Sequence, residues 1–89
     1  MKNYAKIVIM FIEYMNKAME KAEYKQLEDG TWFAEIPGFE GVWGNGKTVE
    51  EACKDLWEVL EEWILLKIHD GDVLPVMGGI ELKIAPAGV

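Results

Sequence analysis

Cysteine and histidine are scarce in this chain, which has one residue of each type among 89. A single cysteine excludes an internal disulfide and favours a reducing, cytoplasmic setting. A single histidine gives too few ligands for a typical zinc site and no nucleophile–base pair for a catalytic triad. His69 is expected in the last turn of a helix and Cys53 on the apolar side of the same helix. We therefore expect no metal, no cofactor and no enzymatic activity.

Basic residues are also few, because nine Lys and Arg stand against 16 Asp and Glu and give a formal charge of −7. Nucleic-acid phosphates require a basic surface, so direct DNA binding is not expected. The same charge argues against binding to an anionic membrane. It suits a basic protein partner, and it equally suits a protein that is acidic only for solubility.

No apolar run is long enough to span a bilayer, which takes about 20 residues. The run Ile7–Ile12 stops at Glu13 and has no small-residue cleavage site after it, so it does not resemble a secretory signal. We expect neither a targeting segment nor a membrane segment.

Hydrophobic spacing and turn residues divide the chain into six expected elements. Asp29-Gly30 predicts a hairpin in which both central residues take positive φ. Thr48 and Glu51 form a capping-box pattern that begins a helix, and Asp70-Gly71 ends it. The expected elements are a helix over 4–22, strands over 23–28, 31–36 and 42–45, a helix over 49–69 and a final strand over 80–85.

These elements predict an α+β fold with one small, mostly antiparallel sheet packed by the long helix. Residues 1–89 form a single domain, with 1–22 as an N-terminal helical extension and 23–85 as a β-β-β-α-β core. Apolar residues of the second helix cover roughly twice the arc that a one-sided surface helix needs. This helix is therefore expected to contact the sheet and also either the first helix or another subunit.

The stretch Gly41–Thr48 matches the phosphate-loop pattern G-x-x-x-x-G-K-[ST] in full and directly precedes a helix. In a true phosphate loop, backbone N–H groups surround the phosphates and the lysine adds positive charge. Here a turn, Pro37–Glu40, precedes the motif instead of a buried parallel strand, and the chain is too short for a doubly wound sheet. A turn followed by a helix N-cap is the favoured interpretation, with nucleotide binding as a remote alternative.

Residues 24–63 resemble the HicB-like antitoxin family. The resemblance rests on several punctuating residues in the family's order and spacing, and with the succession of elements it extends over residues 22–85. The matching residues are Tyr24, Trp32–Pro37, Phe39–Val42, Gly46–Ala52, Leu56, Leu60 and Trp63.

The resemblance implies a partial RNase-H-like fold without catalysis, since this fold lacks the acidic constellation of a nuclease. Members of the family neutralise HicA-type toxins, which are small basic ribonucleases, and they commonly self-associate. Many also carry a C-terminal DNA-binding domain, whereas only Pro86–Val89 follow the last expected strand here. Glu40 stands where the family often has proline.

The leading prediction is therefore an antitoxin-like protein that sequesters a small basic toxin-like ribonuclease. Loop position, charge and aromatic content select the candidate partner-binding residues Glu28, Asp29, Trp32, Phe39 and Glu40.

Two alternatives remain. The first is a structural or regulatory homo-oligomer, a dimer or tetramer, without a toxin. Its candidate interface is the apolar surplus at Ile9, Met10, Phe11 and Leu65. The second, more remote, is a nucleotide-binding protein or a degenerate nuclease.

Overall fold

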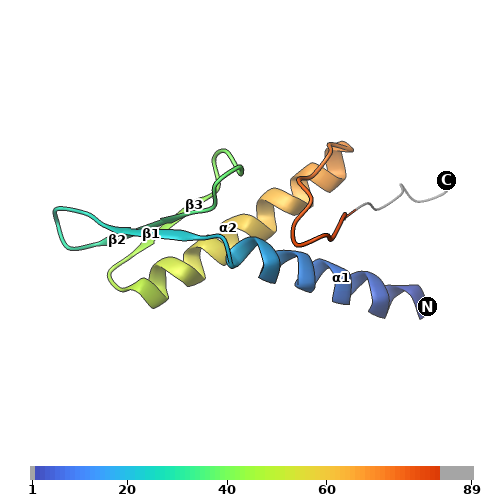
Figure 1. Ribbon diagram of the computed structural model, residues 1–89, viewed down its shortest axis with the longest axis horizontal. Coiled ribbons are helices and arrows are strands. Elements are labelled where there is room, and N and C mark those ends of the chain that lie inside the picture. Colours follow the sequence, from blue (N-terminus) through green and yellow to red (C-terminus); the bar gives the residue numbers. More distant parts are fainter. Residues whose placement is uncertain (1, 83–89) are drawn as a thin grey trace.

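The computed structural model describes the backbone of residues 2–82 and the side chains of residues 9–82. The chain forms a helix, three strands and a second, longer helix, arranged as in Figure 1. The elements in chain order are α1 (Lys2–Met19), β1 (Glu23–Gln26), β2 (Trp32–Glu35), β3 (Trp43–Gly46) and α2 (Val49–Asp70). The predicted α+β class and the order of these elements are confirmed.

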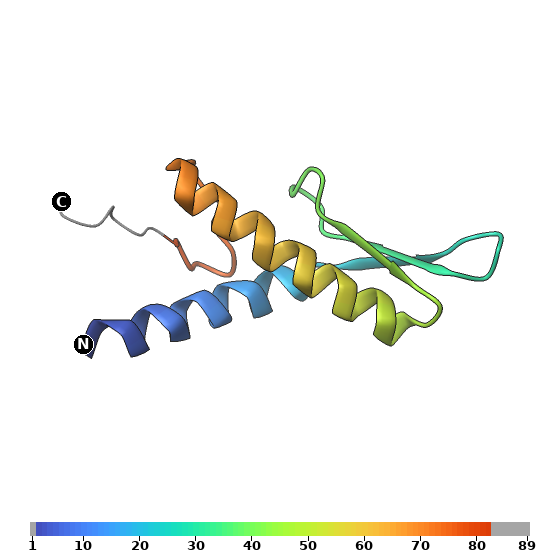
Figure 2. The ribbon, with the colours of Figure 1, turned by 180° about the vertical axis from the view of Figure 1, so that it is seen from behind.

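The strands form one antiparallel sheet in the order β1-β2-β3. Tyr24 lies opposite Ala34, and Ala34 lies opposite Gly44. Helix α2 crosses one face of this sheet, as seen from behind in Figure 2. Because Ala34 and Ile36 are 0% and 2% exposed, the helix-facing side of β2 is the one that the alternation predicts.

Both ends of α2 follow the predicted signals. The Thr48 side chain accepts from the Glu51 N–H, and the Glu51 carboxylate accepts from the Thr48 N–H. Gly71 ends the helix with φ 74°, and its N–H donates to the Ile68 carbonyl oxygen, while the Asp72 N–H donates to the Lys67 carbonyl oxygen. The helix runs one residue further than predicted, to Asp70.

The β1–β2 hairpin differs from the predicted two-residue turn. Gly30 has φ 89°, while no described non-glycine residue has positive φ, so Asp29 stays in the ordinary region. The Gly30 N–H donates to the Leu27 carbonyl at 2.9 Å, and the Leu27 N–H donates to the Thr31 carbonyl at 2.8 Å. The loop thus has three residues, 28–30, in the arrangement of a turn followed by a glycine bulge.

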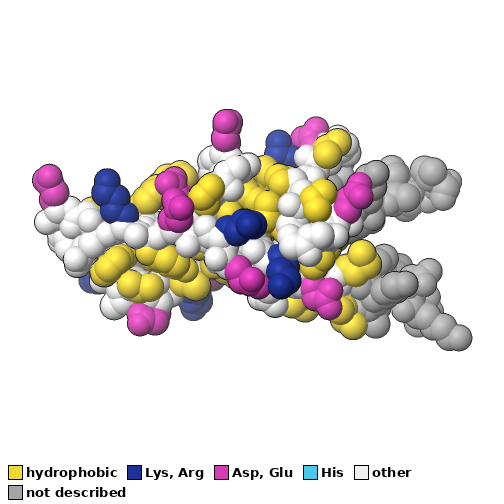
Figure 3. Space-filling model, in the orientation of Figure 1, with side chains coloured by type: hydrophobic (Ala, Val, Ile, Leu, Met, Phe, Trp, Pro, Cys, Tyr) yellow, Lys and Arg dark blue, Asp and Glu magenta, His cyan; other side chains and the backbone are white. Residues whose placement is uncertain are grey.

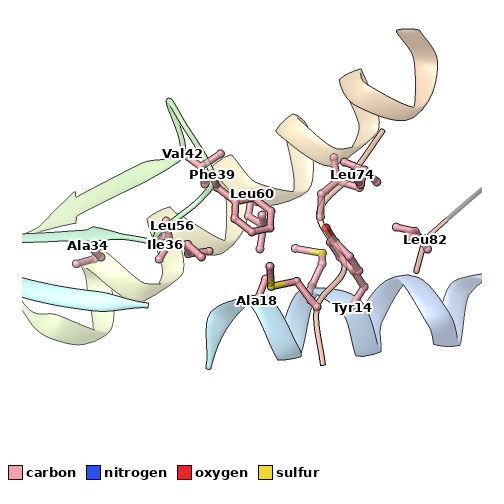
Figure 4. Packing of buried hydrophobic residues seen from close by; sticks show 14 residues of the cluster. Tyr14, Ala18, Ala34, Ile36, Phe39, Val42, Leu56, Leu60, Leu74 and Leu82 are labelled. Carbon is pink, nitrogen blue, oxygen red and sulfur yellow. The ribbon is translucent and has the colours of Figure 1, made fainter. Parts of the chain in front are cut away.

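The core joins the sheet, both helices and the segment after α2, as Figure 4 shows. The Tyr14 side chain is buried, and its hydroxyl donates to the Pro75 carbonyl oxygen, 61 residues away in sequence. This bond ties the C-terminal segment to α1. The buried hydrophobic residues are Tyr14, Met15, Ala18, Ala34, Ile36, Phe39, Val42, Ala52, Leu56, Leu60, Ile64, Leu74, Met77 and Leu82.

The expected final strand lies only partly within the described residues. Ile80 forms an isolated antiparallel bridge with Met77, while Glu81 and Leu82 are not in a strand. Residues 83–85 lie outside the described part. Between α2 and residue 82, the chain forms a loop that packs Leu74 and Leu82 into the core. The glycines at 78 and 79, both with positive φ, turn the chain tightly at this bridge.

Alkaline pH is expected to weaken the fold between about pH 10 and 12. Burial raises the pKa of Tyr14 from its ordinary 10.0 to about 12. The folded state therefore keeps the phenolic proton more tightly, and this stabilisation is full below pH 10 and is lost as the pH rises through 12. Urea unfolding across this range measures the fall. Tyr14→Phe is expected to lose about 1 kcal/mol at neutral pH, through the missing hydrogen bond, and to show a smaller alkaline fall.

The alkaline loss of stability does not vanish in Tyr14→Phe, because a second tyrosine contributes to it. Burial, together with the neighbouring Cys53 thiol, also raises the pKa of Tyr24 to about 12. The variant Tyr24→Phe is the matched control. An alkaline fall of equal size in the parent chain and in Tyr14→Phe would contradict this account of Tyr14.

Candidate functional site

The sheet has one face packed by α2 and one face that no other described element covers. In β2, Trp32 and Ala34 point toward α2, so Phe33 and Glu35 point to the open face. The register places Lys25 and Asn45 on either side of Phe33. It likewise places Glu23 and Trp43 on either side of Glu35.

Aromatic side chains occupy the middle of this open face. The rings of Phe33 and Trp43 stack with their centroids 5.8 Å apart and their planes at 28°. Trp43 is 49% exposed and Leu27, beside them, is 40% exposed. We call Leu27, Phe33 and Trp43 the aromatic sheet face. Figure 3 shows hydrophobic side chains gathered over the sheet, at the left of the view, with charged side chains around them.

Two shallow hollows of about 430 and 480 Å³ lie on this face and share Leu27 and Phe33. Their rims carry both signs of charge. The acidic residues are Glu23, Glu35 and Asp29, and the basic residues are Lys25 and Lys47. Open hollows of this kind, apolar in the middle and charged at the rim, have the composition of a protein-binding surface.

The hairpin tip beside the aromatic sheet face is held by Asp29. Its carboxylate accepts from the Thr31 N–H at 2.9 Å and from the Thr31 hydroxyl at 2.6 Å. These hydrogen bonds favour the charged form and lower the pKa of Asp29. Asp29 is therefore fixed in position, while the neighbouring Glu28 is exposed.

The structure does not bring the five predicted partner-binding residues together. Glu28 and Asp29 lie exposed at the hairpin tip, and Glu40 lies exposed in the loop before β3. Trp32 points toward α2 and packs against the core.

The prediction that Phe39 binds a partner is corrected, because its side chain is 3% exposed. The centroid of its ring lies 5.1 Å from that of the Trp63 ring. A buried core side chain is not available to a partner. Phe33 and Trp43 were missed, although the alternation of β2 already placed Phe33 on the side opposite Ala34.

The predicted oligomer interface is available only in part. Ile9 is 55% exposed and Leu65 is 53% exposed. Met10 and Phe11 are partly buried against the core, which corrects their assignment. They lie one helical turn before Tyr14 and Met15, so they share the face of α1 that packs inward.

The phosphate-loop pattern has a structural explanation. The Lys47 and Thr48 N–H groups donate to the Glu51 carboxylate at 2.8 and 3.2 Å, and the Asn45 N–H donates to the Asp55 carboxylate at 3.0 Å. These are backbone groups that a phosphate would need, and here carboxylates occupy them. The second glycine of the motif serves packing, because a Cβ on Gly46 would lie 2.7 Å from the Ala52 backbone nitrogen of α2.

The remaining reactive side chains form no second site. His69 is exposed, and its ring nitrogen Nδ1 lies 3.3 Å from the Asp70 carboxylate. Cys53 is partly buried, less fully than its apolar neighbours predict. Among the described residues, no three His, Cys, Asp or Glu side chains gather where they could hold a metal ion. No helix within residues 2–82 has the length and apolar character needed to cross a membrane.

Comparisons with known proteins agree with this architecture. Residues 13–75 match the model of the family described as UPF0150-like. The crystal structure of TTHA0281 from Thermus thermophilus superposes with a TM-score of 0.80 at 29% identity, covering 86% of this chain and 96% of that one. The search of curated proteins gives no match. Because the family match covers well over half of the sequence, the chain belongs to the UPF0150-like family.

Proposed function

We propose that this chain is a non-catalytic, antitoxin-like protein that sequesters a small basic ribonuclease of the HicA type. The observation that carries the proposal is the aromatic sheet face, where the exposed Trp43 stacks on the partly buried Phe33 on a face that no other described element covers. Membership of the UPF0150-like family, which is related to the HicB-like antitoxins, supports the same role. The formal charge of −7 favours a basic partner.

The proposed mechanism is masking of the ribonuclease surface. Trp43 and Phe33 would pack against apolar residues of the partner, because exposed aromatic rings supply much of the binding energy of protein interfaces. Glu23, Glu35 and Glu28 would face its basic side chains and speed association. RNA would then be excluded by the bound chain, with no chemical step required of this protein.

The test begins with capture of the partner by the tagged chain from its own host. The captured small basic protein is then produced alone, and its cleavage of RNA is measured with and without the chain. We expect inhibition at one-to-one stoichiometry. Replacing both aromatic residues, Phe33→Ala with Trp43→Ala, is expected to weaken binding about 100-fold or more, as loss of an interface hot spot does.

Leu66→Ala is the matched control, because Leu66 is 63% exposed but lies on α2, outside the sheet. It should leave inhibition unchanged. Thermal unfolding of each variant separates lost binding from lost folding. Normal inhibition by the folded Phe33/Trp43 double variant would reject this surface, and a captured protein without ribonuclease activity would reject the antitoxin role.

A second candidate function is a structural or regulatory homo-oligomer without a toxin. The exposed apolar residues Ile9 and Leu65 favour it, since each leaves more than half of its side-chain surface in water. Ile9→Ser with Leu65→Ser should then turn an oligomer into a monomer in light scattering. An unchanged mass would remove these residues from any interface.

A further inference from the structure

Strand β1 has a free edge. The Leu27 N–H donates to Thr31 of the neighbouring strand, so by alternation the backbone groups of Lys25 and Glu23 also point to β2. The backbone N–H and C=O groups of Tyr24 and Gln26 therefore point away from β2, toward the free edge. No described strand pairs with that side of β1, and all four β1 side chains are exposed.

The opposite edge of the sheet is closed. At β3, the outward N–H of Asn45 donates to the Asp55 carboxylate, and the next outward N–H, that of Lys47, donates to the Glu51 carboxylate. Acidic side chains of α2 thus occupy two successive donors that a further strand would use. Proteins commonly block sheet edges in this way to prevent pairing with other chains. Only β1 offers an unblocked edge within the described sheet.

The charges on β1 select one way of pairing this edge with a second copy. Two antiparallel copies of β1 that keep the same side chains on the same face can be centred on any of its four residues. Centring on Gln26 places Lys25 opposite Leu27 and gives neither copy an attractive charge pair within the strand. Centring on Lys25 places Lys25 opposite its own copy, and centring on Glu23 places two glutamates opposite each other. Centring on Tyr24 instead places Glu23 opposite Lys25 twice, so that both pairs attract.

We propose that the chain forms a symmetric dimer through β1, with Tyr24 opposite Tyr24 of the second copy. In the register that gives attractive charge pairs, the backbone groups also find partners. The N–H and C=O of Tyr24 point outward and lie opposite the same groups of the second copy. The two Tyr24 residues would exchange two hydrogen bonds. Two three-stranded sheets would join into one continuous antiparallel sheet, with both α2 helices on the same side.

This dimer accounts for the wide apolar arc of α2. Tyr24 and Cys53 contact each other on the helix side of the sheet, and Trp57 follows Cys53 by one helical turn. All three are exposed or only partly buried in the single chain. They would lie beside the dimer axis, and the dimer would bury more of their surface. The aromatic sheet face stays open, so this inference does not rest on the proposed function.

A charge exchange tests the register. Glu23→Lys and Lys25→Glu each turn two attractive cross-strand pairs into repulsive ones, so each is expected to weaken the dimer roughly tenfold. An equimolar mixture of the two variants restores both pairs and should form a mixed dimer with the parent affinity. Glu23→Lys also removes the contact between like charges at Glu23 and Glu35 within one chain, so it should not weaken folding. Sedimentation equilibrium measures the dimer dissociation constant of each variant and of their mixture, for comparison with that of the parent.

A cross-link tests the symmetry axis. In a Cys53→Ala background, Tyr24→Cys should form an intermolecular disulfide rapidly, because opposed residues of a hydrogen-bonded pair have Cα atoms about 5.5 Å apart. Gln26→Cys, on the same edge but off the axis, is the matched control and should cross-link slowly.

A chain that stays monomeric at millimolar concentration overturns the proposal. Equal affinities of the parent and Glu23→Lys overturn the register, as do equal cross-linking rates at positions 24 and 26. Loss of the dimer in Lys25→Glu with normal inhibition of a ribonuclease would separate this interface from the proposed function.

Discussion

Replacing Gly44 with alanine is expected to lower the free energy of unfolding by about 3 kcal/mol, as severe overpacking of a core does. Gly44 lies in the middle of β3, at the point where the sheet rests on α2. A Cβ there would be 2.4 Å from the Leu56 backbone nitrogen and 2.9 Å from the Ala52 carbonyl oxygen. Because both are backbone atoms of a regular helix, neither can move aside without separating the helix from the sheet.

The matched control is Asn45→Ala, the next residue of the same strand, whose exposed side chain lies on the open face. It is expected to change stability by less than about 0.5 kcal/mol. Urea denaturation of both variants gives the comparison. A Gly44→Ala protein as stable as the parent would show that the sheet and α2 do not approach as closely as described.

Leu60→Ala is expected to cost about 3 kcal/mol, within the range for a buried leucine that leaves a cavity. Leu60 is 0% exposed and lies beside Phe39 in the middle of the core, where the sheet side and the α1 side of the molecule meet (Figure 4). Removal of its side chain would leave space between elements that are far apart in sequence. Thermal unfolding is expected to stay cooperative at a lower midpoint.

Leu66→Ala provides the control on the same helix, because the same atoms are removed from a side chain that is 63% exposed. Its effect should stay within about 0.5 kcal/mol. Equal losses at positions 60 and 66 would mean that α2 buries a different face from the one described, and the assignment of the core would then fail.

Local signals allowed correct prediction of the order of the helices and strands up to α2 and of the residues that cap both ends of α2. The capping pair Thr48 and Glu51 and the terminal Gly71 act within a few residues, so their chemistry is complete in the sequence. The inward positions of Ala34 and Ile36 follow from a period of two, which needs no knowledge of the partner helix.

The residues of the candidate site were harder to predict from the sequence, because the burial of a side chain outside helices and strands depends on residues far away in the chain. Phe39 stands in a loop without periodicity, and Trp63, 24 positions later, covers it. Gly46 matches a phosphate-binding pattern, yet its small size is required by α2 packing on the sheet. In both cases the contact that explains the residue lies outside its own segment of the chain.

The carboxylates that close the β3 edge have a consequence for the chain during its synthesis. Residues up to Gly46 leave the ribosome before Asp55 does, so the outer edge of β3 is open to other nascent chains until α2 begins to form. Asp55 lies only ten residues after Asn45, and contacts so near in sequence form early in folding. The interval of exposure is therefore brief, and the helix that completes the core also protects the growing chain from aggregation.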